Sequence, residues 1–104
     1  MKILFDQGTP APLRGKLAPH TVATAYEMGW ADLKNGDLLR EAEDVFELFI
    51  TPDQNLGYQQ NLKGRQLAIL VLPTTSWPEI QEHIPEVVSA VAAAKPGDYR
   101  ELEW

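Results

Sequence analysis

The sequence lacks cysteine, has two histidines, and contains no long apolar run. Without cysteine the chain has no disulfide, no thiolate zinc site and no cysteine nucleophile, and this composition fits a reducing cytoplasm. His20 and His83 are 63 positions apart, which disfavours a histidine metal site or a catalytic triad. No apolar segment approaches the ~20 residues of a membrane span, and the run before Asp6 is too short for a signal-peptide core. We therefore expect a cytoplasmic protein with no membrane partner.

Two common phosphate-binding loops are also missing, since neither GxGxxG nor GxxxxGK[ST] occurs. What is present is 104 residues that are 44% hydrophobic and 23% charged. This length holds one hydrophobic core that needs no disulfide or metal to fold. We predict a single domain over 1–104.

Basic side chains are fewer than acidic ones, 9 against 15, and the net charge is −6. A nucleic-acid-binding protein usually carries a basic surface, so this balance argues against such a partner. The charge is unevenly distributed, however: residues 71–104 carry −4 and residues 1–70 only −2. A bound cation would bring the first two-thirds of the chain close to neutrality.

Hydrophobic patterning predicts strands and helices in alternation. The expected strands are 2–5, 20–24, 47–51 and 66–72, with 99–104 as a further edge strand; the expected helices are 10–17, a short turn ending at 28, 36–44, 54–62 and 76–94. Thr9 and Asn35 have the residue types of helix N-caps, Ser76 with Glu79 forms a capping box, and Pro85 is expected to kink the last helix. The strand over 66–72 is apolar almost throughout, which is typical of a strand buried on both faces of a parallel sheet. The pattern predicts a three-layer α/β/α sandwich with a mostly parallel sheet of about four strands.

Acidic residues follow the expected strands. Asp6 comes directly after the first strand and Asp53 shortly after the third, so in neighbouring parallel strands their carboxylates would emerge at one edge of the sheet. Asp37 reaches that edge if the loop before it curls over the strand ends. Converging carboxylates repel each other, and a divalent cation with oxygen ligands, naturally Mg²⁺, relieves the repulsion.

Each acid also has a purely structural interpretation. Asp53 has the residue type and position of a helix N-cap, a role compatible with metal binding. Asp37 is favoured near a helix N-terminus by the helix dipole, whatever the function. A charge at Asp6, directly after an apolar strand, has a high desolvation cost unless another group pairs with it, and this favours a functional role.

Three segments in order resemble a known family. Met1-Lys2-Ile3-Leu4-Phe5-Asp6, then Asn35-Gly36-Asp37-Leu38-Leu39, then Leu48-Phe49-Ile50-Thr51-Pro52-Asp53-Gln54-Asn55-Leu56 are similar to the small PIN-like proteins of the DUF5615 (Mut7-C-like) group. The similarity covers residues 1–72, leaving 73–104 as a C-terminal helix and tail. PIN domains are Mg²⁺- or Mn²⁺-dependent ribonucleases, and many small bacterial ones are toxins of toxin–antitoxin pairs.

The resemblance implies a set of site residues. Asp6, Asp37 and Asp53 would be the metal ligands and catalytic residues of an endoribonuclease, and Thr51 would be the hydroxyl residue before the last acid. Asn55 would be a further metal ligand, an amide where family members often have another acid. The residues that would position the RNA backbone are Arg14, Lys34, Arg40, Lys63 and Arg65. The implied partners are RNA and an antitoxin protein, and the apolar-faced last helix can dock on the sheet or on a second subunit of a homodimer.

Two other interpretations remain open. The low basic count and Asn55 also suit a catalytically weak or inactive PIN-like module that acts through a protein partner. Acids at strand ends over Mg²⁺ also suit a receiver domain of the response-regulator kind, although the fourth strand continues as Leu72-Pro73 where such a domain carries a lysine.

Overall fold

The computed structural model describes residues 1–56 and 65–104. Its five strands are β1 (Lys2–Phe5), β2 (Thr21–Thr24), β3 (Leu48–Thr51), β4 (Ala68–Val71) and β5 (Tyr99–Glu101). They form one sheet in the order β2-β1-β3-β4-β5, and every neighbouring pair is parallel. The predicted parallel α/β sandwich is confirmed, with five strands instead of about four because the tail pairs with β4.

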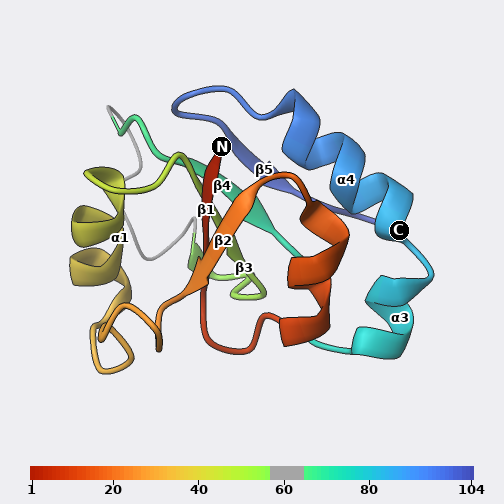
Figure 1. Ribbon diagram of the computed structural model, residues 1–104, viewed down its shortest axis with the longest axis horizontal. Coiled ribbons are helices and arrows are strands. Elements are labelled where there is room, and N and C mark those ends of the chain that lie inside the picture. The colour runs from red at the N-terminus through yellow and green to blue at the C-terminus, as the bar shows by residue number, and fades with distance from the viewer. Residues whose placement is uncertain (57–64) are drawn as a thin grey trace.

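Helices cover both faces of this sheet (Figure 1). They are the 3₁₀ helix η1 (Ala11–Leu17) and the α-helices α1 (Asn35–Glu43), α3 (Trp77–Gln81) and α4 (Ile84–Ala93). Side chains alternate across a strand, so Ile3 of β1 packs with η1, α3 and α4 on one face while Leu4 packs with α1 on the other. The sheet thus lies between two hydrophobic layers. Within the described ranges, no helix is long and apolar enough to cross a membrane.

Several local predictions need correction. Pro10, not Thr9, occupies the N-cap of η1, and the Thr9 hydroxyl donates instead to the Ile50 carbonyl at 3.1 Å. Asn35 is already inside α1, whose N-cap is Lys34. The Thr9 hydroxyl is thus engaged with the end of β3 and does not cap η1.

The long C-terminal helix is two helices. Ser76 caps α3 as predicted, accepting the Glu79 N–H at 3.4 Å, but α3 ends at Gln81 and α4 begins at Ile84. Pro85 therefore lies in the first turn of a new helix, where its missing N–H costs nothing, and does not kink a continuous one. The break lets α3 and α4 both contact η1.

The order of the strands reverses between β1 and β3. The chain leaves β1 in one direction to form β2, then returns to form β3 on the opposite side of β1. In open parallel sheets, ligands bind beyond the carboxyl ends of the strands at such a reversal. The residues after Phe5 and after Thr51 therefore occupy the expected position of a site.

Candidate functional site

Asp6 and Asp53 lie together at the carboxyl ends of β1 and β3, as the sequence predicts. The Asp6 N–H donates to the Ile50 carbonyl at 3.0 Å, which extends the β1–β3 pairing by one residue and fixes the backbone of Asp6. Thr51 joins the two acids: its hydroxyl donates to Asp6 Oδ2 at 2.7 Å and accepts the Asp53 N–H at 3.0 Å. Thr51 is the fully buried polar residue among those described. One buried hydroxyl therefore links the Asp6 carboxylate to the Asp53 backbone.

The Asp6 carboxylate is half-buried. Its burial raises the pKa of the carboxyl above the ordinary value, and the negative charge of Asp53 raises it further. Hydrogen bonds from the Thr51 hydroxyl and the Gln7 N–H oppose that rise in the pKa. Among the described residues no lysine or arginine forms an ion pair with Asp6. The site therefore holds a poorly solvated acid beside a second acid.

Two loops meet over these acids. Gly8 has φ +87°, and a Cβ at this position would lie 3.3 Å from Cγ of Pro52, the residue before Asp53. A side chain there would crowd the loop after β3. The Gln7 amide also donates to the Ala31 carbonyl at 3.2 Å, which ties the loop before α1 to the same edge. In the sequence, Gly8 is marked only by its position two residues after Asp6 at the end of a strand. Its close approach to Pro52 is a contact between distant segments that the sequence does not indicate.

Asp37 lies in the first turn of α1, and Figure 1 places the start of α1 at the same end of the sheet as the end of β1. Its side chain is 59% exposed and pairs with Arg40 at 3.4 Å. Among residues 1–56 and 65–104 no three acidic or histidine side chains come together as a group that could hold a metal ion. The structure therefore brings together two of the three predicted acids, Asp6 and Asp53, and leaves Asp37 on the helix surface.

Asn55 supports Asp53 through its backbone. Its N–H donates to Asp53 Oδ1 at 2.9 Å, and its side chain is exposed. This contact is an Asx turn. The helix that Asp53 was predicted to cap lies mostly outside the described residues, so its N-cap role stays a prediction. The oxygen atoms of Asp6 and Asp53 are hard donors of the kind that Mg²⁺ prefers, and Mg²⁺ is commonly held by one or two carboxylates together with water and phosphate oxygens. Two acids thus fit such an ion.

Most of the predicted RNA-positioning cations are engaged in ion pairs. Arg14 pairs with Glu27 at 2.9 Å, Arg40 with Asp37, and Arg65 with Glu43 at 3.8 Å. Lys34 is exposed at the start of α1 and forms no ion pair with any described residue. Lys63, and most of the helix predicted over 54–62, lie outside the described residues.

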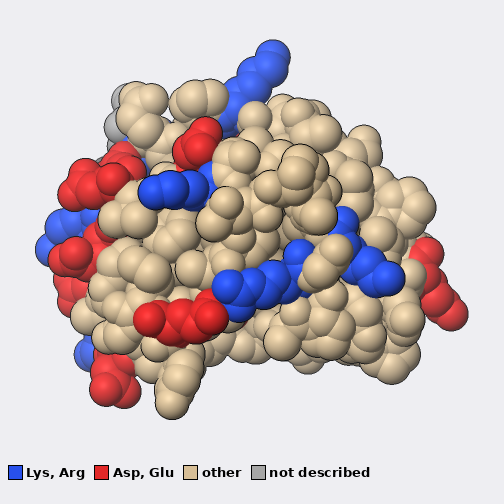
Figure 2. Space-filling view, in the orientation of Figure 1, with Lys and Arg blue, Asp and Glu red and all other residues tan. Residues whose placement is uncertain are grey.

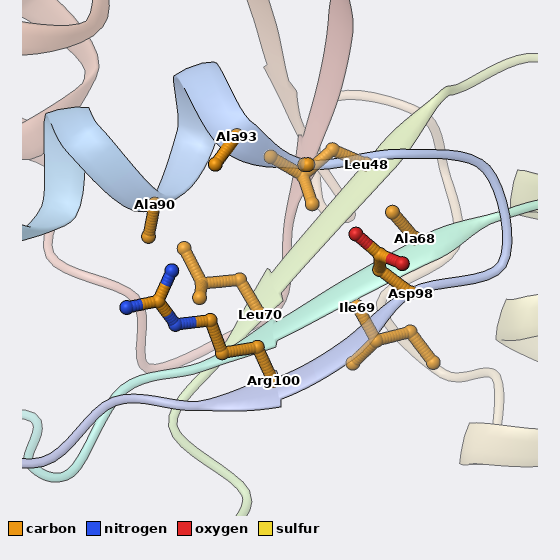
Figure 3. A pocket seen from close by; sticks show the side chains of 9 residues that line it. Leu48, Ala68, Ile69, Leu70, Ala90, Ala93, Asp98 and Arg100 are labelled. Atoms are coloured by element: carbon orange, nitrogen blue, oxygen red, sulfur yellow. The ribbon is translucent and has the colours of Figure 1, made fainter.

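The hollow between α4 and the sheet is a different kind of feature. Figure 3 shows Arg100 extending beneath Ala90, with Asp98 near the other end and leucine side chains between them. Its volume of about 40 Å³ admits little more than water-sized molecules. It is a gap in packing left by the small alanines of α4, and it is not a ligand site.

Comparisons of the chain with protein-family models, with curated proteins and with solved structures found no match.

Proposed function

We propose that this protein is a Mg²⁺- or Mn²⁺-dependent endoribonuclease of the PIN-like kind that its sequence resembles. The observation that carries the proposal is the pair Asp6 and Asp53, joined through buried Thr51 at the reversal of strand order. A half-buried acid with a raised pKa beside a second acid is a common arrangement at functional sites. A divalent cation would offset both the burial and the repulsion.

In this proposal, Asp6 and Asp53 hold the ion by their carboxylate oxygens, and Thr51 bonds to the Asp6 carboxylate and to the Asp53 backbone. When bound, the ion supplies a polarised phosphate and a water of lowered pKa. Lys34, on the exposed start of α1, contributes a cation for the RNA backbone at the same end of the sheet. Its contact with phosphate would position the strand and would not read sequence.

The biological setting belongs to the same proposal. A small cytoplasmic ribonuclease of this kind would act as the toxin of a toxin–antitoxin pair, with RNA as substrate and an antitoxin protein as partner. Only the family resemblance over residues 1–72 supports this part of the proposal.

One set of observations favours a second function, a catalytically weak PIN-like module that acts through a protein partner. Three of the four described candidate cations already pair with acids of the chain, and the net charge is −6. The described residues also provide two clustered acids where the resemblance implies three. Such a site would bind a metal ion weakly.

Cleavage assays separate the two functions. Purified protein is incubated with single-stranded and structured RNA in Mg²⁺ or Mn²⁺, beside Asp6→Asn and Asp53→Asn variants and an Asp44→Asn control at an exposed position. An endoribonuclease loses about a hundredfold or more of its rate in each site variant and none in the control, because metal sites are sensitive even to loss of outer contacts. Equal cleavage by wild type and Asp53→Asn would identify a contaminating nuclease. No cleavage by any protein would leave the partner-binding module as the function.

A further inference from the structure

A glutamine follows each acid of the candidate site. Gln7 comes directly after Asp6 and Gln54 directly after Asp53, and both glutamines are exposed in the loops after β1 and β3. Neither side chain takes part in the proposed metal site. What such an amide contributes beside a carboxylate depends on its engaged group, because the NH₂ group donates hydrogen bonds and the oxygen accepts them.

Both glutamine side chains donate to the backbone of a neighbouring loop. Gln7 Nε2 donates to the Ala31 carbonyl at 3.2 Å, in the loop before α1. Gln54 Nε2 donates to the Pro73 carbonyl at 2.5 Å, in the loop after β4. β1 and β3 are adjacent in the sheet, and β4 lies on the far side of β3. Each acidic loop is therefore anchored to a different loop outside the pair.

These two bonds extend a series of contacts that crosses the carboxyl ends of the strands. In its middle, the Thr51 hydroxyl links the Asp6 carboxylate to the Asp53 backbone. On either side, the Gln7 N–H donates to Asp6 Oδ1 at 2.8 Å and the Asn55 N–H donates to Asp53 Oδ1 at 2.9 Å. With the two glutamine amides at its ends, the series joins the loops after β1, β3 and β4 to the loop before α1.

The two anchors are neutral, which suits a site for a cation. In the described part of the chain, Asp6 forms no ion pair with a lysine or arginine. The strands run toward the lower margin of Figure 1, and that margin is mostly uncharged on the face drawn in Figure 2. A lysine or arginine used as an anchor would repel a metal ion at the acids. An amide holds the loop and leaves the charge of the site unchanged.

We propose that Gln7 and Gln54 are positioning residues for the metal ion that Asp6 and Asp53 would hold. Their amides fix the two acidic loops before the ion binds, so that binding does not have to order them. The glutamines thereby raise metal affinity without touching the ion. This role rests on the proposed function, because without a bound cation the two anchors would serve the fold alone.

Mn²⁺ binding to glutamine variants tests this role. Gln7→Met and Gln54→Met keep the length of the side chain and remove the amide, while both carboxylates stay in place. We expect the Mn²⁺ dissociation constant, measured by isothermal titration calorimetry, to rise about tenfold in each variant, as for other contacts outside the metal ligands. Gln81→Met is the matched control, since Gln81 is exposed at the end of α3.

Gln54→Glu separates anchoring from charge. A carboxylate cannot donate to the Pro73 carbonyl, but its negative charge beside Asp53 would by itself lower the Mn²⁺ dissociation constant. We expect the dissociation constant to rise, because water and salt screen the charge of an exposed group. A dissociation constant at or below the wild-type value overturns the anchoring role of Gln54.

Two further comparisons separate this role from a purely structural one and from failure of the metal site. An anchor that serves only the fold lowers the urea midpoint and leaves the dissociation constant of the folded chain unchanged. Circular dichroism checks that every variant is folded at the titration temperature. Wild-type affinity in both methionine variants, beside weakened binding by Asp53→Asn, overturns the positioning role alone. No Mn²⁺ binding by wild type at millimolar concentration overturns the proposed function as well.

Discussion

Thr51 links the two acids of the candidate site through a single hydroxyl, which both donates to Asp6 and accepts from Asp53. Thr51 is fully buried, so this hydroxyl belongs to the core of the sheet while the two acids are only half-buried. Thr51 therefore links the buried core of the sheet to the two acidic residues at the sheet edge.

Thr51→Val removes the hydroxyl and keeps the shape of the side chain. We expect it to lower the free energy of unfolding by about 1–3 kcal/mol, because the Asp53 N–H loses its acceptor in a part-buried position. Urea denaturation measures the loss, and Thr51→Ser, which keeps the hydroxyl, is the control. A valine variant as stable as the serine variant would contradict this role.

Asp6 makes stability depend on pH. Its raised pKa means that the folded chain binds the Asp6 proton more tightly than the unfolded chain, so this carboxyl favours folding at pH below the unfolded value of 3.8. That contribution is lost as pH rises through the folded pKa. Asp6→Asn has no such dependence, so its stability relative to wild type should be greater at pH 7 than at pH 3 in metal-free buffer.

The measurement is urea denaturation of wild type and Asp6→Asn at both pH values. Asp44→Asn, which removes an exposed carboxylate, serves as the control. The same offset between Asp6→Asn and wild type at the two pH values would count against a raised Asp6 pKa. Addition of Mn²⁺ should stabilise wild type more than Asp6→Asn if the carboxylate is a ligand.

Gly8 is a backbone requirement of the site. Gly8→Ala combines a left-handed conformation, which costs about 1–2 kcal/mol in a residue with a Cβ, with the 3.3 Å approach to Pro52. We expect a loss of at least about 1 kcal/mol in the free energy of unfolding, measured by thermal or urea denaturation. Gly15→Ala has open space around the new Cβ and should lose less.

At the scale of elements, the start of α3 shows how local signals work. The Ser76 side chain accepts the Glu79 N–H, as the S-x-x-E pattern predicts, and Trp77 and Pro78 occupy the first turn. A helix of five residues has few internal hydrogen bonds, so its cap contributes a large share of its stability.

Ser76→Ala should lower the free energy of unfolding by about 1 kcal/mol, the usual effect of removing an N-cap. Ser76→Asp keeps an acceptor and should recover most of that loss. Thermal denaturation of wild type, Ser76→Ala and Ser76→Asp measures these differences. Equal midpoints for the three proteins would mean that the 3.4 Å contact does not contribute to stability.

At the scale of the whole molecule, one sheet joins the two hydrophobic layers. Ile3 and Leu4 are adjacent in sequence, fully buried, and point to opposite layers. Both layers pack on the same strands, so loss of either layer would expose a buried face of the sheet that also supports the other layer. The chain should therefore unfold in one cooperative transition.

Ile3→Ala and Leu4→Ala test this cooperativity. Each should lower the free energy of unfolding by about 2–5 kcal/mol, the cost of a cavity in a packed core. Tryptophan fluorescence and far-ultraviolet circular dichroism should report the same midpoint for both variants. Two separate transitions in either variant would show that the layers unfold independently.

The sequence by itself determined the alternation of strands and helices, the parallel sheet, and the presence of Asp6 and Asp53 at strand ends, because apolar periodicity and strand exits are local properties of the chain. It also identified the Ser76 cap and the edge strand in the tail. It placed the Thr9 and Asn35 caps wrongly and joined α3 to α4. The Thr9 hydroxyl bonds instead to the carbonyl of Ile50, 41 positions away, a contact that no local pattern specifies. Only the tertiary structure decided that strand order reverses between β1 and β3, and that Thr51 and Gly8 hold the two acidic residues in place. It also left Asp37 paired with Arg40 on the surface of α1. These outcomes depend on pairs of residues up to 45 positions apart, such as Asp6 and Thr51, which no local pattern specifies.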